Sequence, residues 1–162
     1  GRAVLCECEP VLSDVTRLPG IDGKSKMSKS LGNSIPLSSS PDSIRKAVRA
    51  MYTDEGHLRV SDPGQVEGNV VFAFLDAFEP DAGAVAELKA RYQRGGLADS
   101  VVKRALDDRL QDFLAPIRER RQRLANDIGS VRSILRDGTG RARERAAATV
   151  DAVKRALGLV YF

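Results

Sequence analysis

The chain of 162 residues lacks the patterns that mark several common classes of protein. Its longest apolar run, VVFAFL at residues 70–75, is far shorter than the roughly 20 residues of a membrane-spanning helix. No initiator methionine and no signal sequence stand at its start. A membrane-spanning helix is therefore excluded, and we expect the chain to be a fragment, the later part of a longer protein.

Metal ligands and disulfide partners are also scarce, because the chain has only 2 cysteines and 1 histidine. Cys6 and Cys8 stand two residues apart, a spacing whose geometry does not suit a disulfide. Together with His57 they are too few to form a structural zinc site. The sequence therefore predicts no metal site, reduced thiols in the cytoplasm, and an exposed His57 on a loop.

Positive charge is unevenly distributed along the chain. Residues 1–100 hold 12 Lys and Arg against 14 Asp and Glu, whereas residues 118–162 hold 11 against 5. A basic C-terminal region is typical of proteins that bind a phosphate backbone, although exposed arginine-rich helices have the same composition. Arg118, Arg121 and Arg123 therefore have two interpretations: a solvated helix face with local ion pairs, or a surface that faces RNA.

Hydrophobic periodicity predicts a mainly α fold. Residues 3–15 alternate in polarity through Val4, Cys6 and Cys8 and indicate a strand or two, interrupted by Pro10. Glycine, proline and serine then mark an irregular loop up to residue 40. Apolar residues recur at helical spacing in segments 41–51, 69–78, 81–94 and from 99 onward. We expect Gly138 and Gly140 to end one helix before a last helix over residues 141–157.

The most polar part of that loop is DGKSKMSKSLGNSI, residues 22–35. Glycines allow the backbone to approach a polyanion, and lysines such as Lys24, Lys26 and Lys29 carry mobile positive charge. The order of residues is not that of a Walker phosphate loop. By composition alone, both a phosphate-binding loop and a solvated surface loop fit.

The order of residues favours the first interpretation. Lys26-Met27-Ser28-Lys29-Ser30 reads KMSKS, the second signature of class I aminoacyl-tRNA synthetases. With RLPGIDGKSKMSKSLGN, SPDSIRKAVRAMYTD, EGNVVFAFLDAF, GGLADSVVKRAL and LAPIRERR in this order, the chain resembles the bacterial tryptophanyl-tRNA synthetases. The resemblance runs from about residue 7 to the C-terminus. The family's other signature, of His-Ile-Gly-His type, and its tryptophan pocket have no counterpart in this chain.

The resemblance implies a fold and a division into domains. Residues 1–40 are expected to be the C-terminal edge of a Rossmann-like α/β catalytic domain with the KMSKS loop. Residues 41–162 are expected to form an all-helical anticodon-binding domain. The parent would be a cytoplasmic tryptophan--tRNA ligase and a homodimer, and the fragment alone is expected to be inactive.

The resemblance also implies roles for the loop. Lys26 and Lys29 would be catalytic and would stabilise charge on the phosphates of ATP, which carries Mg²⁺. Met27 would lie near the adenine, and Ser28 and Ser30 would bind phosphate oxygens or hold the loop. The other partners implied are L-tryptophan and tRNA(Trp). Two alternatives stay open: a tyrosyl-tRNA synthetase fragment, and a non-catalytic helical RNA-binding module.

Overall fold

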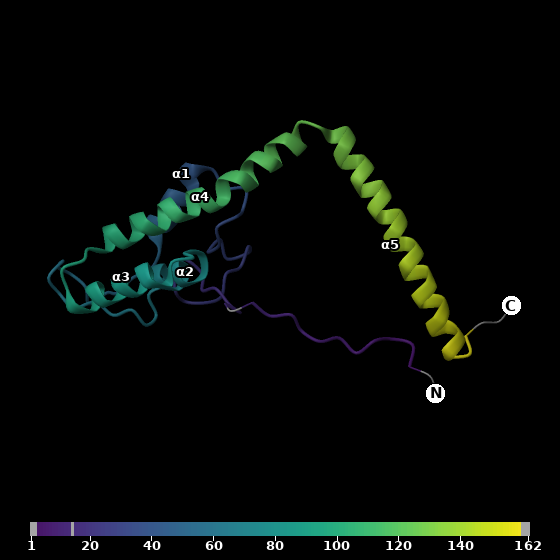
Figure 1. Cartoon of the computed structure of the whole chain (residues 1–162), viewed down its shortest axis with the longest axis horizontal. Coiled ribbons are helices and arrows are strands. Elements are labelled where there is room, and N and C mark those ends of the chain that lie inside the picture. Colours follow the sequence, from purple (N-terminus) through teal and green to yellow (C-terminus); the bar gives the residue numbers. More distant parts are fainter. Residues whose placement is uncertain (1–2, 14, 160–162) are drawn as a thin grey trace. The chain divides into compact units, whose positions relative to one another are not determined.

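The computed structural model describes residues 3–13 and 15–159. Five helices lie in these residues: α1 (Pro41–Ala50), α2 (Val70–Phe78), α3 (Ala82–Arg94), α4 (Asp99–Ala125) and α5 (Ile128–Ala156). They are labelled in Figure 1. The mainly α fold that the sequence predicts is confirmed.

Contacts divide the chain into two compact units. The central unit is Ser13–Arg120, and the terminal unit joins Gly1–Leu12 with Arg121–Phe162. The predicted boundary between residues 40 and 41 falls inside the central unit, where the segment before α1 packs on the helices. A division by contacts does not test a division by function, so that boundary stays a prediction.

Local sequence signals fix where the helices of the central unit begin. Ser40 caps α1, since its hydroxyl accepts a hydrogen bond from the Ser43 amide at 3.2 Å, and Pro41 follows at the first position. Asn69 caps α2 by accepting from the Val71 amide at 3.0 Å. Asp81 caps α3 in the same way, accepting from Ala84 at 3.0 Å.

One continuous hydrophobic core holds the central unit together. Helix α2 is its most buried element, and α1, α3 and α4 as far as Ile117 pack around it (Figure 1). The largest side chains with almost no exposure include Tyr92, Phe72, Ile44, Leu75 and Leu106. Each such side chain contributes about 1.5–3 kcal/mol by leaving water. This core is the rigid base on which the loop before α1 rests.

Side-chain bonds also join α1 to α4. The Lys103 ammonium donates to the carbonyl oxygens of Arg49 and Met51, at 2.9 and 2.8 Å. Partial burial lowers the pKa of Lys103. The Gln111 amide donates to the Pro41 carbonyl at 3.0 Å. Because these bonds reach both ends of α1, they fix the helix that directly follows the loop.

The predicted strand is wrong over residues 4–8, and none forms in residues 11–13 after Pro10 either. In the described residues the one bridge between extended segments joins Pro19 and Lys26, and residues 4–8 pair with nothing. An alternating pattern produces a strand only where a second strand supplies hydrogen bonds, and no described segment does so here. Cys6 and Cys8 are free and exposed.

The predicted break at Gly138 and Gly140 is also wrong, because α5 continues through both residues. A glycine inside a helix costs about 1 kcal/mol relative to alanine but keeps its backbone hydrogen bonds, so it weakens the helix without ending it. Gly158, with φ of 70°, does follow the end of α5. Among the described residues, no helix combines the length and the apolar character needed to cross a bilayer.

Candidate active site

The KMSKS loop folds back on itself immediately before α1. The Gly20 amide donates to the Ser25 carbonyl at 2.7 Å, and the Met27 amide donates to the Leu18 carbonyl at 3.4 Å. Gly23 lies in the turn that both bonds enclose, and its φ of 68° is a conformation that favours glycine. The chain therefore enters the KMSKS residues from a closed turn rather than from a free coil.

Within KMSKS, the methionine and the lysines have opposite environments. Met27 is half-buried and packs against the hydrophobic core. Lys26 and Lys29 are exposed, and their ammonium groups make no hydrogen bond or ion pair to any described residue. The loop thus anchors one apolar side chain and leaves two cations available to an anion from outside.

The two serines of the motif hold each other. The hydroxyl oxygens of Ser28 and Ser30 lie 2.9 Å apart, within hydrogen-bond distance. The Ser28 amide donates to the side-chain oxygen of Asn33 at 2.8 Å. Of the two predicted roles for these serines, the contacts inside the chain fit that of holding the loop.

Tyr52, just beyond α1, contacts the loop through both its backbone and its ring. Its amide donates to the Ile21 carbonyl at 2.9 Å, and its own carbonyl accepts from the Val70 amide at 3.2 Å. A Cβ atom on Gly23 would lie 3.0 Å from the Tyr52 ring. Tyr52 thereby connects the loop to the start of α2.

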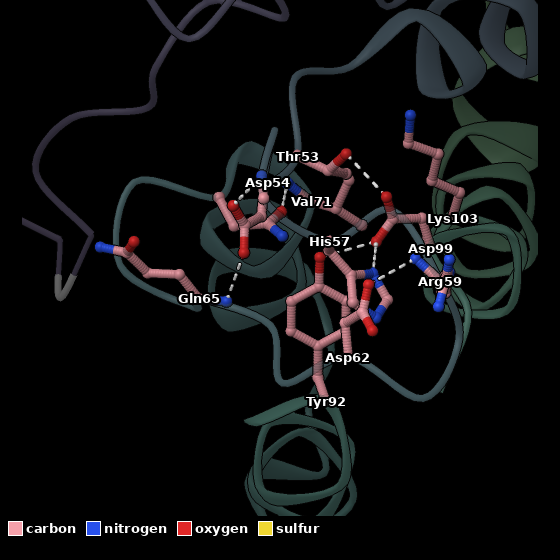
Figure 2. A network of polar contacts seen from close by, with 12 residues as sticks. Thr53, Asp54, His57, Arg59, Asp62, Gln65, Val71, Tyr92, Asp99 and Lys103 are labelled. Atoms are coloured by element: carbon pink, nitrogen blue, oxygen red, sulfur yellow. Dashed lines mark hydrogen bonds and ion pairs between the residues drawn. The ribbon is translucent and has the colours of Figure 1, made fainter. Parts of the chain in front are cut away.

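The next residue, Thr53, opens a polar network centred on Asp99 (Figure 2). The Asp99 carboxylate accepts from the Thr53 hydroxyl at 2.9 Å and from the Tyr92 hydroxyl at 2.7 Å, and it lies 3.1 Å from Nδ1 of His57. Burial, then the bond to Asp99, raises the pKa of Tyr92. The network ties the connection between α1 and α2 to α3 and α4.

The expectation of an exposed His57 is wrong, because its side chain is only 3% exposed. Its ring packs against Tyr92, with ring centroids 4.6 Å apart. The sequence places His57 on a polar loop, and nothing near it in sequence reveals that Asp99, 42 residues later, supplies its partner.

Asp54 also holds the connection between α1 and α2 (Figure 2). Its carboxylate accepts from the amides of Gln65 at 2.7 Å and Gly56 at 2.8 Å. Those two backbone bonds, first that from Gln65, lower the pKa of Asp54. Residues 54–65 are thereby held as a closed loop despite containing no helix or strand.

A second polar feature of the central unit is a groove of about 520 Å³ between α1 and α4. Arg45, Arg49, Lys103 and Arg104 line it. Its charge is partly balanced, because Asp107 and Asp108 line it too and Arg45 lies 3.3 Å from Asp107.

The three arginines predicted to face RNA have different surroundings. Arg118 is half-buried and donates through Nη2 to the Gln111 side-chain oxygen at 3.4 Å. Its Nη1 is buried and has no partner among the described residues. Arg121 and Arg123 are exposed and have no ion pair to a described residue. The two interpretations of these residues, solvated face and RNA contact, both remain open.

The fold and the loop define a class of protein: a KMSKS loop placed directly before a helical domain is typical of the C-terminal part of class I aminoacyl-tRNA synthetases. The model of the family described as tRNA synthetases class I (W and Y) matches residues 5–115, more than half of the chain. The chain belongs to this family.

Among curated proteins, the tryptophan--tRNA ligase of Clostridium longisporum is 49% identical over 100% of this chain and 48% of its own length. That of Streptococcus pneumoniae is 53% identical over 90% of this chain and 43% of its own. This chain therefore spans about half the length of these relatives.

Solved structures of tryptophanyl-tRNA synthetases are also similar to this chain. A tryptophanyl-tRNA synthetase from Campylobacter jejuni, complexed with ADP and tryptophan, has a TM-score of 0.73 at 27% identity. The match covers 88% of this chain and 43% of that one. The tryptophanyl-tRNA synthetase from Giardia lamblia has a TM-score of 0.58 at 28% identity, over 65% of this chain and 28% of its own.

Proposed function

We propose that the complete protein is a tryptophan--tRNA ligase, which activates L-tryptophan with ATP as tryptophanyl-adenylate and transfers it to tRNA(Trp). The observation that carries this proposal is the KMSKS loop, whose two lysine ammonium groups are exposed and without partners in the described chain. The tryptophan--tRNA ligases at 49% and 53% identity support the amino acid.

In the proposed reaction, a carboxylate oxygen of tryptophan attacks the α-phosphorus of ATP. The bond from that phosphorus to the bridging oxygen breaks, and pyrophosphate leaves with the negative charge. Lys26 and Lys29 are the catalytic residues, because ammonium groups beside the departing pyrophosphate stabilise charge that is absent from the ground state. Each such interaction is worth about 3–4 kcal/mol, or 10²–10³ in rate.

Mg²⁺ belongs to the proposal as part of the ATP substrate. In residues 3–13 and 15–159, no group of three or more His, Cys, Asp or Glu side chains is arranged to hold a metal ion. The ion would arrive on the phosphates, with the lysines sharing its role of neutralising them. Met27 near the adenine, and Ser28 and Ser30 near phosphate oxygens, stay predictions of the same kind.

Amino-acid-dependent exchange of pyrophosphate into ATP, catalysed by the product of the complete open reading frame, tests the proposal. We expect exchange with tryptophan at least about 10²-fold faster than with tyrosine, because a site built for one side chain rejects another that leaves its groups unpaired. Tyrosine-dependent exchange would instead establish the tyrosyl alternative. The 162-residue chain alone serves as the control and should be inactive.

The tRNA partner, the homodimer and the cytoplasmic location are further parts of the proposal. The basic excess of residues 118–162 supports the first, because a positive surface attracts a phosphate backbone. The same charge also supports the second candidate function, a helical RNA-binding module without catalysis. Absence of exchange with any amino acid, together with retained RNA binding, would favour that module.

If the proposed interactions with tRNA are real, Arg121→Gln with Arg123→Gln should flatten the salt dependence of tRNA binding. The slope of log affinity against log salt is negative, and its magnitude should decrease by about one unit for each phosphate group that the variant no longer neutralises. Cognate and non-cognate tRNA should weaken alike, since backbone contacts carry no sequence information. Adding Arg118→Gln should change the slope less, because its guanidinium is half-buried.

Filter binding at several salt concentrations, after circular dichroism has shown the helices intact, is the measurement. Arg91→Gln is the matched control, because Arg91 is exposed on α3 outside the basic C-terminal region. A slope that stays at the wild-type value in the folded double variant would assign Arg121 and Arg123 to a solvated face.

A further inference from the structure

Asn33 is a buried polar residue with no role assigned in the proposed mechanism. It is 3% exposed, and Asn69, the cap of α2, is the other buried polar residue in the described chain. Asn33 stands three residues after the last serine of KMSKS, in a loop whose other polar side chains are mostly exposed. A buried amide is costly unless its donors and its acceptor are all satisfied.

The bonds of Asn33 reach both sides of Met27. Its side-chain oxygen accepts from the Ser28 amide at 2.8 Å. Its Nδ2 lies 3.4 Å from the Lys26 carbonyl oxygen and donates toward it. One side chain therefore bonds to the backbone of both Lys26 and Ser28. Its bond to the Ser28 amide closes a ring that contains residues 28–33.

Two further acceptors fix the amide itself. Nδ2 lies 3.2 Å from a carboxylate oxygen of Asp22 and 3.3 Å from the Ser25 hydroxyl. Since an amide nitrogen has two hydrogens, it shares them among three acceptors. The main-chain carbonyl oxygen of Asn33 also accepts a hydrogen bond from the Ile21 amide at 2.9 Å. Asn33 thus joins the entry of the loop to its exit.

Gly20 lies directly against the Asn33 side chain. A Cβ atom on Gly20 would lie 2.2 Å from Nδ2 of Asn33, so glycine at this position is what admits the amide. Only an amide offers one acceptor and two donors from one short side chain. Aspartate has no donor for these acceptors.

From this geometry we propose that Asn33 is the positioning residue of the KMSKS loop: its amide closes the ring that carries Lys29 and fixes the backbone of Lys26. The inference rests on the proposed function, because it states how the two catalytic lysines are held toward ATP. Positioning of this kind has large effects, because a displacement of about 1 Å can cost about 10²-fold in rate.

Exchanging the two bonded side chains, with Asp at position 33 and Asn at position 22, tests the proposal directly. Asn33→Asp keeps the acceptor for Ser28 but sets a carboxylate against that of Asp22. Asp22→Asn in the same protein restores a donor facing an acceptor. In the complete protein we expect Asn33→Asp to lower kcat/KM for ATP about 10²-fold with an unchanged KM for tryptophan. The double variant should have a kcat/KM for ATP at least about 10-fold higher than that of Asn33→Asp.

Asp81→Ala is the matched control for a loss of stability. It removes the cap of α3, far from the loop in sequence, and should lower the melting temperature without changing the ATP kinetics. If Asn33→Asp keeps wild-type kinetics, or if Asp22→Asn does not relieve its loss, the positioning role is overturned. An equal kinetic loss in Asp81→Ala would also overturn it.

Hydrogen exchange in the 162-residue chain tests the geometry without any catalytic assay. The Ser28 amide should be protected in the wild type and in Asn33→Asp, and should exchange at least about 10-fold faster in Asn33→Ala. If the complete wild-type protein shows no tryptophan-dependent exchange while Ser28 follows this pattern, the proposed function fails and the ring closed by Asn33 stands. An unprotected Ser28 in the wild type would overturn the inference by itself.

Discussion

Replacing Lys29 with alanine in the complete protein should lower the rate of adenylate formation by about 10²–10³, with little change in tryptophan affinity. The ammonium of Lys29 has no partner among the described residues, so its removal breaks no bond that stabilises the fold. The loss should therefore appear in the chemical step, where negative charge moves onto pyrophosphate. Lys26→Ala should act in the same direction.

Lys24→Ala is the matched control for this experiment. Lys24 is a third exposed lysine of the same loop but stands before the KMSKS residues. If general positive charge were enough, its removal would cost as much as that of Lys29; if the signature positions matter, it should cost less than about 10-fold.

Pre-steady-state measurement of adenylate formation separates two possible roles. Variants that keep their chemical rate and only bind ATP more weakly would show that the lysines bind ground state and transition state equally. That result would remove the proposed transition-state role while leaving these residues in the ATP site.

Several elements could be predicted from the sequence because their determinants are local. Ser40, the cap of α1, and Pro41, its first residue, together predict where this helix begins. Pro80 follows the end of α2 closely, and Asp81 caps the start of α3. KMSKS is itself contiguous, so the loop and its lysines were recognisable without any knowledge of what surrounds them.

The errors and omissions depend on residues far apart in the chain. Thr53 and Asp99 are 46 residues apart, and a bond between them leaves no periodic pattern in the sequence. The burial of Asn33 was equally hidden, since it depends on the missing side chain of Gly20. The predicted strand at residues 4–8 is wrong for the opposite reason, because its local pattern is present but no partner strand lies among the described residues.

The Asp99 network leads to the second prediction of large effect. Asp99→Ala should lower the free energy of unfolding of the central unit by about 3 kcal/mol, because Tyr92, Thr53 and His57 lose their common acceptor. The His57 side chain is almost fully buried, so water cannot easily replace the carboxylate. Asp99 also begins α4, where a negative charge favours the helix.

Asp76→Ala is the matched control, because this change also removes a bonded carboxylate, in this case the partner of the Lys89 ammonium at 2.6 Å, but on the surface of α2 and α3. An exposed ion pair of this kind contributes at most about 1 kcal/mol. Urea denaturation of the 162-residue chain, followed by circular dichroism, measures both variants. Asp99→Asn should fall between wild type and Asp99→Ala, since its amide keeps one oxygen as an acceptor.

The same two variants also test the candidate active site, because Thr53 follows Tyr52, whose amide donates to the Ile21 carbonyl at the entry of the KMSKS loop. In Asp99→Ala, hydrogen exchange of the Tyr52 amide should accelerate more than in Asp76→Ala. Equal exchange in the two variants, or a loss of stability no larger than that of Asp76→Ala, would show that the Asp99 network does not support the loop. Faster exchange confined to Asp99→Ala would extend the support of the KMSKS loop from Tyr52 through Thr53 to the first residue of α4.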